Sequence, residues 1–126
     1  MKAILLVALG GAVGSVARYK LSGLVLHQTV DWRFPAGTFA VNVIGCLAAG
    51  VLAGLAEKHD MLSPDARLLL FTGLLGGFTT FSSFGLDTFT LAEGGRAGTA
   101  AVNVAIQVVA GCALVAAGYA AGARVQ

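Results

Sequence analysis

The residues with the greatest capacity for chemistry lie together in the second half of the sequence, at positions 72–84 (TGLLGGFTTFSSF). This segment combines the glycine pair Gly76 and Gly77 with a run of hydroxyl side chains, yet it lies inside an apolar stretch long enough to cross a membrane. Irregular backbone is tolerated at membrane depth only where protein or a water-filled cavity covers it. We therefore predict a membrane helix that is interrupted around Gly76 and Gly77 and resumes through Thr79.

Such a break exposes backbone groups that can bind ions of either charge. Freed carbonyl oxygens can hold a hard cation such as sodium, and a nearby helix N-terminus favours anions. The alternative is a glycine kink that serves close packing. The adjacent hydroxyls favour a binding site.

Polar side chains also recur one helical turn apart in two other apolar segments. Thr38 and Asn42 share one helix face, and Asn103 and Gln107 repeat the spacing. Hydrogen bonding between helices is the plain explanation for such residues in lipid. Two matched stripes beside a broken helix favour a lined ion pathway, in which amide hydrogens donate to an anion.

Aromatic and ionisable residues extend this interpretation. Phe81 and Phe84 stand three residues apart, and their ring edges, which carry partial positive charge, could accompany a small anion. Asp87 is the only acidic residue well inside an expected span, and Arg18 could attract anions at the mouth of a vestibule. The alternatives are core or lipid contact for the rings and interfacial positions for the charges.

Length and composition decide the class of protein. The chain has 126 residues, 57% of them hydrophobic and 11% charged, and a mean hydropathy of +0.86, whereas an average soluble domain has about 25% charged residues. We predict an all-α integral membrane protein of one domain, residues 1–126, with four spans of about 3–26, 37–56, 64–92 and 98–123. The scattered net charge of +2 does not suggest a nucleic-acid partner, and without a nucleophile–base pair an enzyme is not expected.

Positive charges leave the orientation of the chain in the membrane open. Four bases lie on each side of the expected membrane: Lys2, Lys58, Arg67 and Arg124 on the side of the termini, and Arg18, Lys20, Arg33 and Arg96 opposite. An equal count does not specify an orientation. Either the difference in positive charge between the two sides is too weak to be seen in this count, or two copies insert in opposite directions and pair antiparallel.

Small residues recur four positions apart at Gly10 and Gly14, Gly50 and Gly54, Gly73 and Gly77, and Gly118 and Gly122. Pairs of this kind let helix backbones approach closely in lipid. Together they predict a compact bundle that extends across an oligomer interface.

Three segments, in their order and spacing, resemble the signature of Fluc/CrcB-type fluoride channels: GGAVGSVARY at 10–19, GTFAVN at 37–42 and GLLGGFTTFSSF at 73–84. The resemblance covers nearly the whole chain. It implies an antiparallel dual-topology homodimer with two fluoride pores in a bacterial inner membrane, where the export of fluoride protects the cytoplasm.

The resemblance also assigns roles to individual residues. It implies a central sodium ion held by backbone carbonyls of Gly76 and Thr79 from both subunits. The implied pore residues are Asn42, Phe81, Phe84, Thr38 and Ser83, and the implied vestibule arginine is Arg18. Two positions depart from the family: Asp87, which we assign to the vestibule with Arg18, replaces a usual glutamate, and Gln107, which we assign to the pore, stands where Ser or His is common.

We predict passive, selective fluoride conduction. Fluoride is strongly hydrated, so a dry pore must replace its water with weak donors such as Asn42 and Thr79. The alternative is a small four-helix proton-coupled multidrug exporter, which needs a carboxylate deep in the membrane. The first expected span has no acidic residue, and Asp87 lies near a helix end. A structural assembly subunit would leave the polar stripes without a purpose.

Overall fold

Helices form all the secondary structure in the described part of the chain. The computed structural model describes residues 1–30, 32–59 and 61–125, and no strand occurs among them. Three spans are single helices: α1 (Lys2–Gln28), α2 (Ala36–Lys58) and α6 (Ala97–Gly122). The third span consists of α3 (Pro64–Arg67), the π-helix η1 (Leu68–Leu75), α4 (Gly76–Phe78) and α5 (Phe81–Glu93). All four spans are long and apolar enough to cross a membrane, which confirms the predicted four-span all-α architecture.

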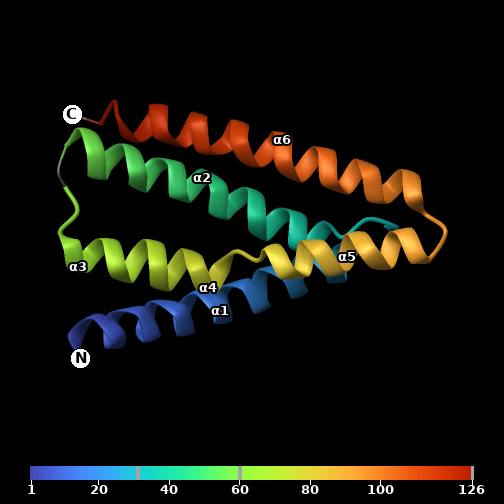
Figure 1. The fold of residues 1–126 in the computed structure, drawn as a ribbon, viewed down its shortest axis with the longest axis horizontal. Coiled ribbons are helices and arrows are strands. Elements are labelled where there is room, and N and C mark those ends of the chain that lie inside the picture. Colours follow the sequence, from blue (N-terminus) through green and yellow to red (C-terminus); the bar gives the residue numbers. More distant parts are fainter. Residues whose placement is uncertain (31, 60, 126) are drawn as a thin grey trace.

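The spans lie side by side, with both termini at the same end of the bundle (Figure 1). The most extensive contacts join α2 to α6 and α1 to η1. In Figure 1 the third span runs between α1 and α2, and its helical course is interrupted between α4 and α5. The break therefore faces α2 on one side and α1 on the other.

The side chains that face outward are apolar, and the positions that face inward are small. The buried residues of α1 are Gly10 and Gly14, whereas their neighbours Leu9 and Val13 are exposed. A soluble bundle would bury such large apolar side chains. Lipid tails are as apolar as leucine, so membrane helices associate through close packing of small residues instead.

The glycine pairs bring helix backbones into contact. A Cβ added at Gly14 would overlap the carbonyl oxygen of Leu74, and one added at Gly50 would overlap that of Val115. The other members of the pairs meet backbone of a neighbouring helix in the same way: Gly10, Gly54, Gly73, Gly77, Gly118 and Gly122. Close backbone packing at the predicted glycine pairs is thus confirmed within the chain.

The interruption of the third span follows the glycine pair and does not coincide with it. Gly76 and Gly77 are themselves helical, so the predicted break is present but begins two residues after Gly77. A Cβ added at Gly77 would lie 2.5 Å from the carbonyl oxygen of Gly11, and this glycine therefore serves packing against α1. The backbone becomes extended at Thr79 (φ −84°, ψ 156°) and Thr80 (φ −151°, ψ 113°). Threonine is β-branched and favours that conformation.

Candidate ion-conduction site

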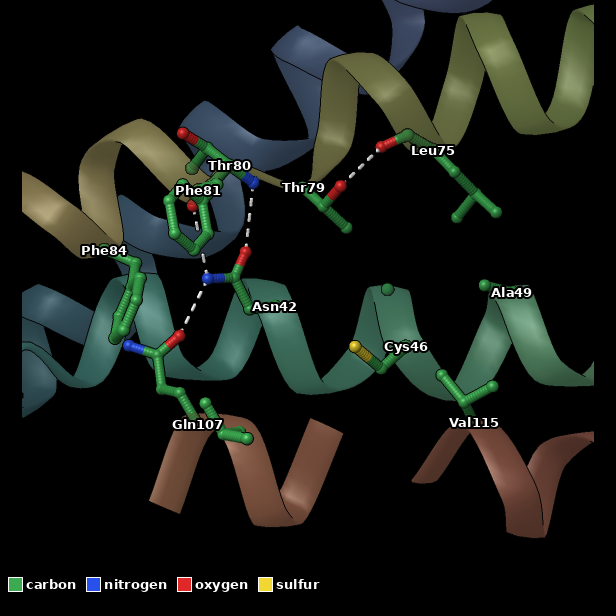
Figure 2. A pocket seen from close by; sticks show the side chains of 12 residues that line it. Asn42, Cys46, Ala49, Leu75, Thr79, Thr80, Phe81, Phe84, Gln107 and Val115 are labelled. Carbon is green, nitrogen blue, oxygen red and sulfur yellow. Dashed lines mark hydrogen bonds between the residues drawn. The ribbon is translucent and has the colours of Figure 1, made fainter. Parts of the chain in front are cut away.

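Asn42 of α2 faces the break and binds both peptide groups of Thr80. Its Oδ1 accepts a hydrogen bond from the Thr80 backbone N–H at 3.0 Å, and its Nδ2 donates to the Thr80 carbonyl oxygen at 3.3 Å (Figure 2). Backbone groups that no helix satisfies are costly at membrane depth. The amide side chain therefore lets the helix open at Thr80 without leaving its peptide groups unpaired.

The break also redirects two backbone donors away from the carbonyls of the preceding turn. In a regular helix the Gly76 carbonyl would accept from the Thr80 N–H, and the Thr79 carbonyl from the Ser83 N–H. Here the Thr80 N–H donates to Asn42 Oδ1, and the Ser83 N–H donates to the Thr80 hydroxyl at 3.1 Å. The two carbonyl oxygens are therefore deprived of their helical donors.

Carbonyl oxygens of this kind suit a hard cation, which prefers oxygen ligands. Gly76 and Thr79 are the two residues for which the family resemblance implies sodium. Among residues 1–30, 32–59 and 61–125, no cluster of three His, Cys, Asp or Glu side chains could hold a metal ion. The carbonyl oxygens of Gly76 and Thr79 are ligands of the kind that a sodium ion takes.

Three amide side chains connect the break to α6. Asn42 Nδ2 donates to Gln107 Oε1 at 2.8 Å, and Gln107 Nε2 donates to Asn103 Oδ1 at 3.0 Å. Asn103 has no exposed surface, and its Nδ2 donates to the Thr88 hydroxyl of α5 at 2.8 Å. The two predicted polar stripes therefore meet, and they do form hydrogen bonds between helices.

A groove of about 340 Å³ opens between α2, α6 and the break (Figure 2). Apolar side chains of α2, α6 and η1 form much of its wall, among them Cys46, Leu75 and Val115. Five of the predicted pore residues line it together: Asn42, Thr79, Phe81, Phe84 and Gln107. A hollow lined by amides, hydroxyls and aromatic rings inside an apolar bundle is suited to a small polar ligand.

Phe81 and Phe84 project from the first turn of α5 at one end of this groove. Their ring centroids are 5.4 Å apart and their planes are inclined by 55°. Phe81 is 83% exposed. Two tilted rings present edges as well as faces, and they stand at a helix N-terminus, where the backbone dipoles favour negative charge.

Two predicted pore residues lie outside the groove. Thr38 of α2 donates from Oγ1 to Asp87 Oδ2 at 2.6 Å. The Ser83 hydroxyl accepts from the Thr80 hydroxyl at 3.1 Å, on the capping turn of α5. Thr38 lies near the start of α2 and Asp87 lies in α5, beyond the break, so the pair extends the polar residues from the break toward the connection that precedes α2.

A second hollow, of about 290 Å³, lies where the connection between α1 and α2 meets α5 and the start of α6. Asp87 lines it together with Arg33 and Arg96, and Arg96 Nη1 donates to the Arg33 carbonyl oxygen at 3.2 Å. This mixed charge agrees with the vestibule role predicted for Asp87. Arg18 is half-buried on α1 and lines neither of the two hollows, so its vestibule role stays a prediction.

Thr80 and Thr88 hold the site together but were not expected from the sequence as site residues, and Asn103 was expected only as part of a stripe. A threonine pair that follows a glycine pair after one intervening residue, Phe78, is a local signal that could have indicated Thr80. No local signal indicates the contact between Thr88 and Asn103, because it depends on the register of α5 against α6.

Four apolar spans, the third of them opened at two threonines, and a groove with polar lining residues at that opening define a small multi-pass membrane protein. Residues 5–119 match the family model described as CrcB-like protein, Camphor Resistance (CrcB), and the chain belongs to this family. The chain is 57% identical over 119 residues to the fluoride-specific ion channel FluC of Methylobacillus flagellatus, a match that covers 94% of this chain and 93% of that protein.

Two further relatives carry the same name. FluC of Azobacteroides pseudotrichonymphae is 42% identical over 119 residues, 94% of this chain and 94% of that protein. FluC of Nitratidesulfovibrio vulgaris is 46% identical over 114 residues, 90% of this chain and 91% of that protein. The resemblance to the Fluc/CrcB family is thereby confirmed. The alternative of a multidrug exporter finds no support, since these relatives are named ion channels.

Proposed function

We propose that this protein is a fluoride-selective ion channel, and not an enzyme, which lets fluoride leave the cytoplasm passively and so protects the cell from fluoride toxicity. The observation that carries the proposal is similarity over 94% of the chain to proteins named fluoride-specific ion channels. The groove that brings Asn42, Phe81, Phe84 and Gln107 together supports it.

Fluoride is small and strongly hydrated, so a narrow pathway must replace its water with hydrogen-bond donors. Of the bonds that Asn42 donates, the one to Gln107 is 2.8 Å long and the one to the Thr80 carbonyl is 3.3 Å. A fluoride ion at Asn42 takes the place of the longer bond, and the ring edges of Phe81 and Phe84 extend the series of contacts. Several weak sites in series suit conduction, because the ion must be able to leave each one.

The functional unit is an antiparallel, dual-topology homodimer. The groove is open on one side, and Phe81 at its end is 83% exposed. Gly76 is exposed on α4, where an added Cβ would meet no atom closer than 3.7 Å. A glycine that its own chain does not require agrees with the close approach of a second backbone. If the C-terminus, tagged and probed from both sides of the membrane, lies on one side only, dual topology is refuted.

A sodium ion at the centre of the dimer fits the carbonyl oxygens of Gly76 and Thr79, which the break deprives of their helical donors. When bound, this ion supplies a fixed positive charge between the two broken helices. We expect the purified dimer to lose thermal stability when sodium is replaced by a large organic cation. A melting temperature that is equal in both salts would contradict a sodium site.

The export role in a bacterial inner membrane is tested in bacteria that lack their own fluoride channel. Cells that express the wild-type protein should grow in added fluoride, and cells that express Phe81→Ile at the same level should not. Growth of wild-type cells no better than that of cells with an empty vector would contradict the proposal.

A further inference from the structure

The hydrogen-bonded chain of Asn42, Gln107 and Asn103, here called the amide relay, runs in one direction through the bundle. Asn42 donates to the oxygen of Gln107, and Gln107 donates to the oxygen of Asn103. Each of these two oxygens therefore accepts from the preceding amide. The relay passes from α2 to α6, and both of its ends return to the third span. It therefore ties three spans together around the groove.

Backbone groups fix the direction of the relay at both ends. At the first end the Thr80 N–H, which can only donate, binds Asn42 Oδ1 at 3.0 Å. At the other end Asn103 donates to the Thr88 hydroxyl, which in turn donates at 2.7 Å to the Phe84 carbonyl oxygen, a group that can only accept. Turning one amide over would place two oxygens or two N–H groups against each other. Only one arrangement pairs every junction.

The middle member of the relay presents this polarity to the groove. Gln107 lines the groove, whereas Asn103 is fully buried and lies outside its lining. The Gln107 nitrogen carries two hydrogens, of which one binds Asn103 Oδ1. In Figure 2 this nitrogen lies on the side of Phe84, and the amide oxygen is turned to Asn42. The second hydrogen is therefore a donor beside the aromatic end of the groove.

We propose that Asn103 is a positioning residue for fluoride conduction. It holds the Gln107 amide so that an N–H, and not the carbonyl oxygen, faces an ion beside Phe84. The inference rests on the proposed function and extends it to a residue that does not touch the ion. Without Asn103 the Gln107 amide keeps only the bond from Asn42 to its oxygen and loses the bond that holds its nitrogen, so the second N–H is no longer held toward the groove.

A purely structural role for Asn103, as a link between α5 and α6, makes a different prediction. A link of that kind contributes to stability whatever residue occupies position 107. A positioning role acts only through Gln107, so its effect must vanish when Gln107 is absent. A double-mutant cycle separates the two.

The test measures fluoride efflux from liposomes for the wild type, Asn103→Leu, Gln107→Leu and the double variant, each checked for folding by size exclusion. We expect each single variant to lower the fluoride flux about tenfold, the effect of one hydrogen bond, and the double variant to stay within about twofold of Gln107→Leu. The inference is overturned if Asn103→Leu keeps the wild-type flux, or if the flux of the double variant falls about tenfold below that of Gln107→Leu. A wild type without fluoride flux overturns the proposed function itself.

A second measurement needs no substitution at Asn103. The chain contains three glutamines, Gln28, Gln107 and Gln126. Nitrogen-15 labelling of glutamine therefore gives a simple spectrum of side-chain amides. The signal of Gln107 is assigned as the one that is lost in Gln107→Leu. We expect added fluoride to shift one side-chain hydrogen of Gln107 and to leave the one bonded to Asn103 in place, while chloride shifts neither. Equal movement of both hydrogens, or movement of neither, overturns the inference.

Discussion

Replacing Asn42 by alanine removes the side chain that satisfies the break in the third span. Three hydrogen bonds are lost: those with the Thr80 N–H at 3.0 Å, the Thr80 carbonyl at 3.3 Å and Gln107 Oε1 at 2.8 Å. At about 1 kcal/mol net for each bond, the free energy of unfolding falls by about 3 kcal/mol. The Thr80 peptide groups, left without the partner that Asn42 gave them at membrane depth, raise the cost toward about 5 kcal/mol.

The assay is reversible unfolding of the purified protein in detergent micelles, compared with two matched variants. Val43→Ala truncates the neighbouring half-buried side chain of α2 and should cost about 1 kcal/mol, an ordinary value for a point substitution. Asn42→Asp keeps an oxygen that can accept from the Thr80 N–H but places its other oxygen against two acceptors, Gln107 Oε1 and the Thr80 carbonyl, so it should cost at least as much as Asn42→Ala. If Asn42→Ala costs no more than Val43→Ala, the reasoning that this amide satisfies the break is refuted.

Two further pairs of substitutions test the packing and the capping around the break. Gly77→Ala places a Cβ 2.5 Å from the Gly11 carbonyl oxygen and should destabilise the fold by about 1–3 kcal/mol. Gly76→Ala should leave the free energy of unfolding of the single chain within about 0.5 kcal/mol of the wild type and should lower the yield of cross-linked dimer. Equal stability of the two variants would contradict the packing described for Gly77. Thr80→Val keeps the β-branch but removes the hydroxyl that caps α5, so it should lower the free energy of unfolding by about 1 kcal/mol. Thr80→Ser keeps the hydroxyl and should lower it less. If calorimetry finds Thr80→Ser less stable than Thr80→Val, the capping role is excluded.

The four spans could be predicted from the sequence because each is determined by the length of an apolar run. The exact position of the break in the third span could not be predicted from the sequence. Glycine in a membrane helix serves either an irregular backbone or a close approach, and only the contact of Gly77 with Gly11 shows which use applies. The break itself arises at Thr79 and Thr80, where the side-chain cap and the amide of Asn42 stabilise an extended backbone.

The candidate site was predictable to the extent that it depends on residue type and local spacing. The spacing of Thr38 and Asn42 places both on one face of α2, but it does not reveal that Thr38 pairs with Asp87 while Asn42 pairs with Gln107. Those partners depend on the rotation of α2 against α5 and α6, and backbone contacts at Gly50 and Gly54 determine the rotation against α6. The role of Asn103 as the buried end of the amide relay depends on the same register.

The most direct test of the central claim is ion efflux from liposomes that contain only the purified wild-type protein. Vesicles loaded with potassium fluoride or potassium chloride are diluted into impermeant salt, a potassium ionophore is added to dissipate the charge, and ion-selective electrodes follow the release of each anion. Passive selective conduction predicts rapid release of fluoride while chloride is retained. Release of both anions at equal rates, or release of neither, would contradict a fluoride channel.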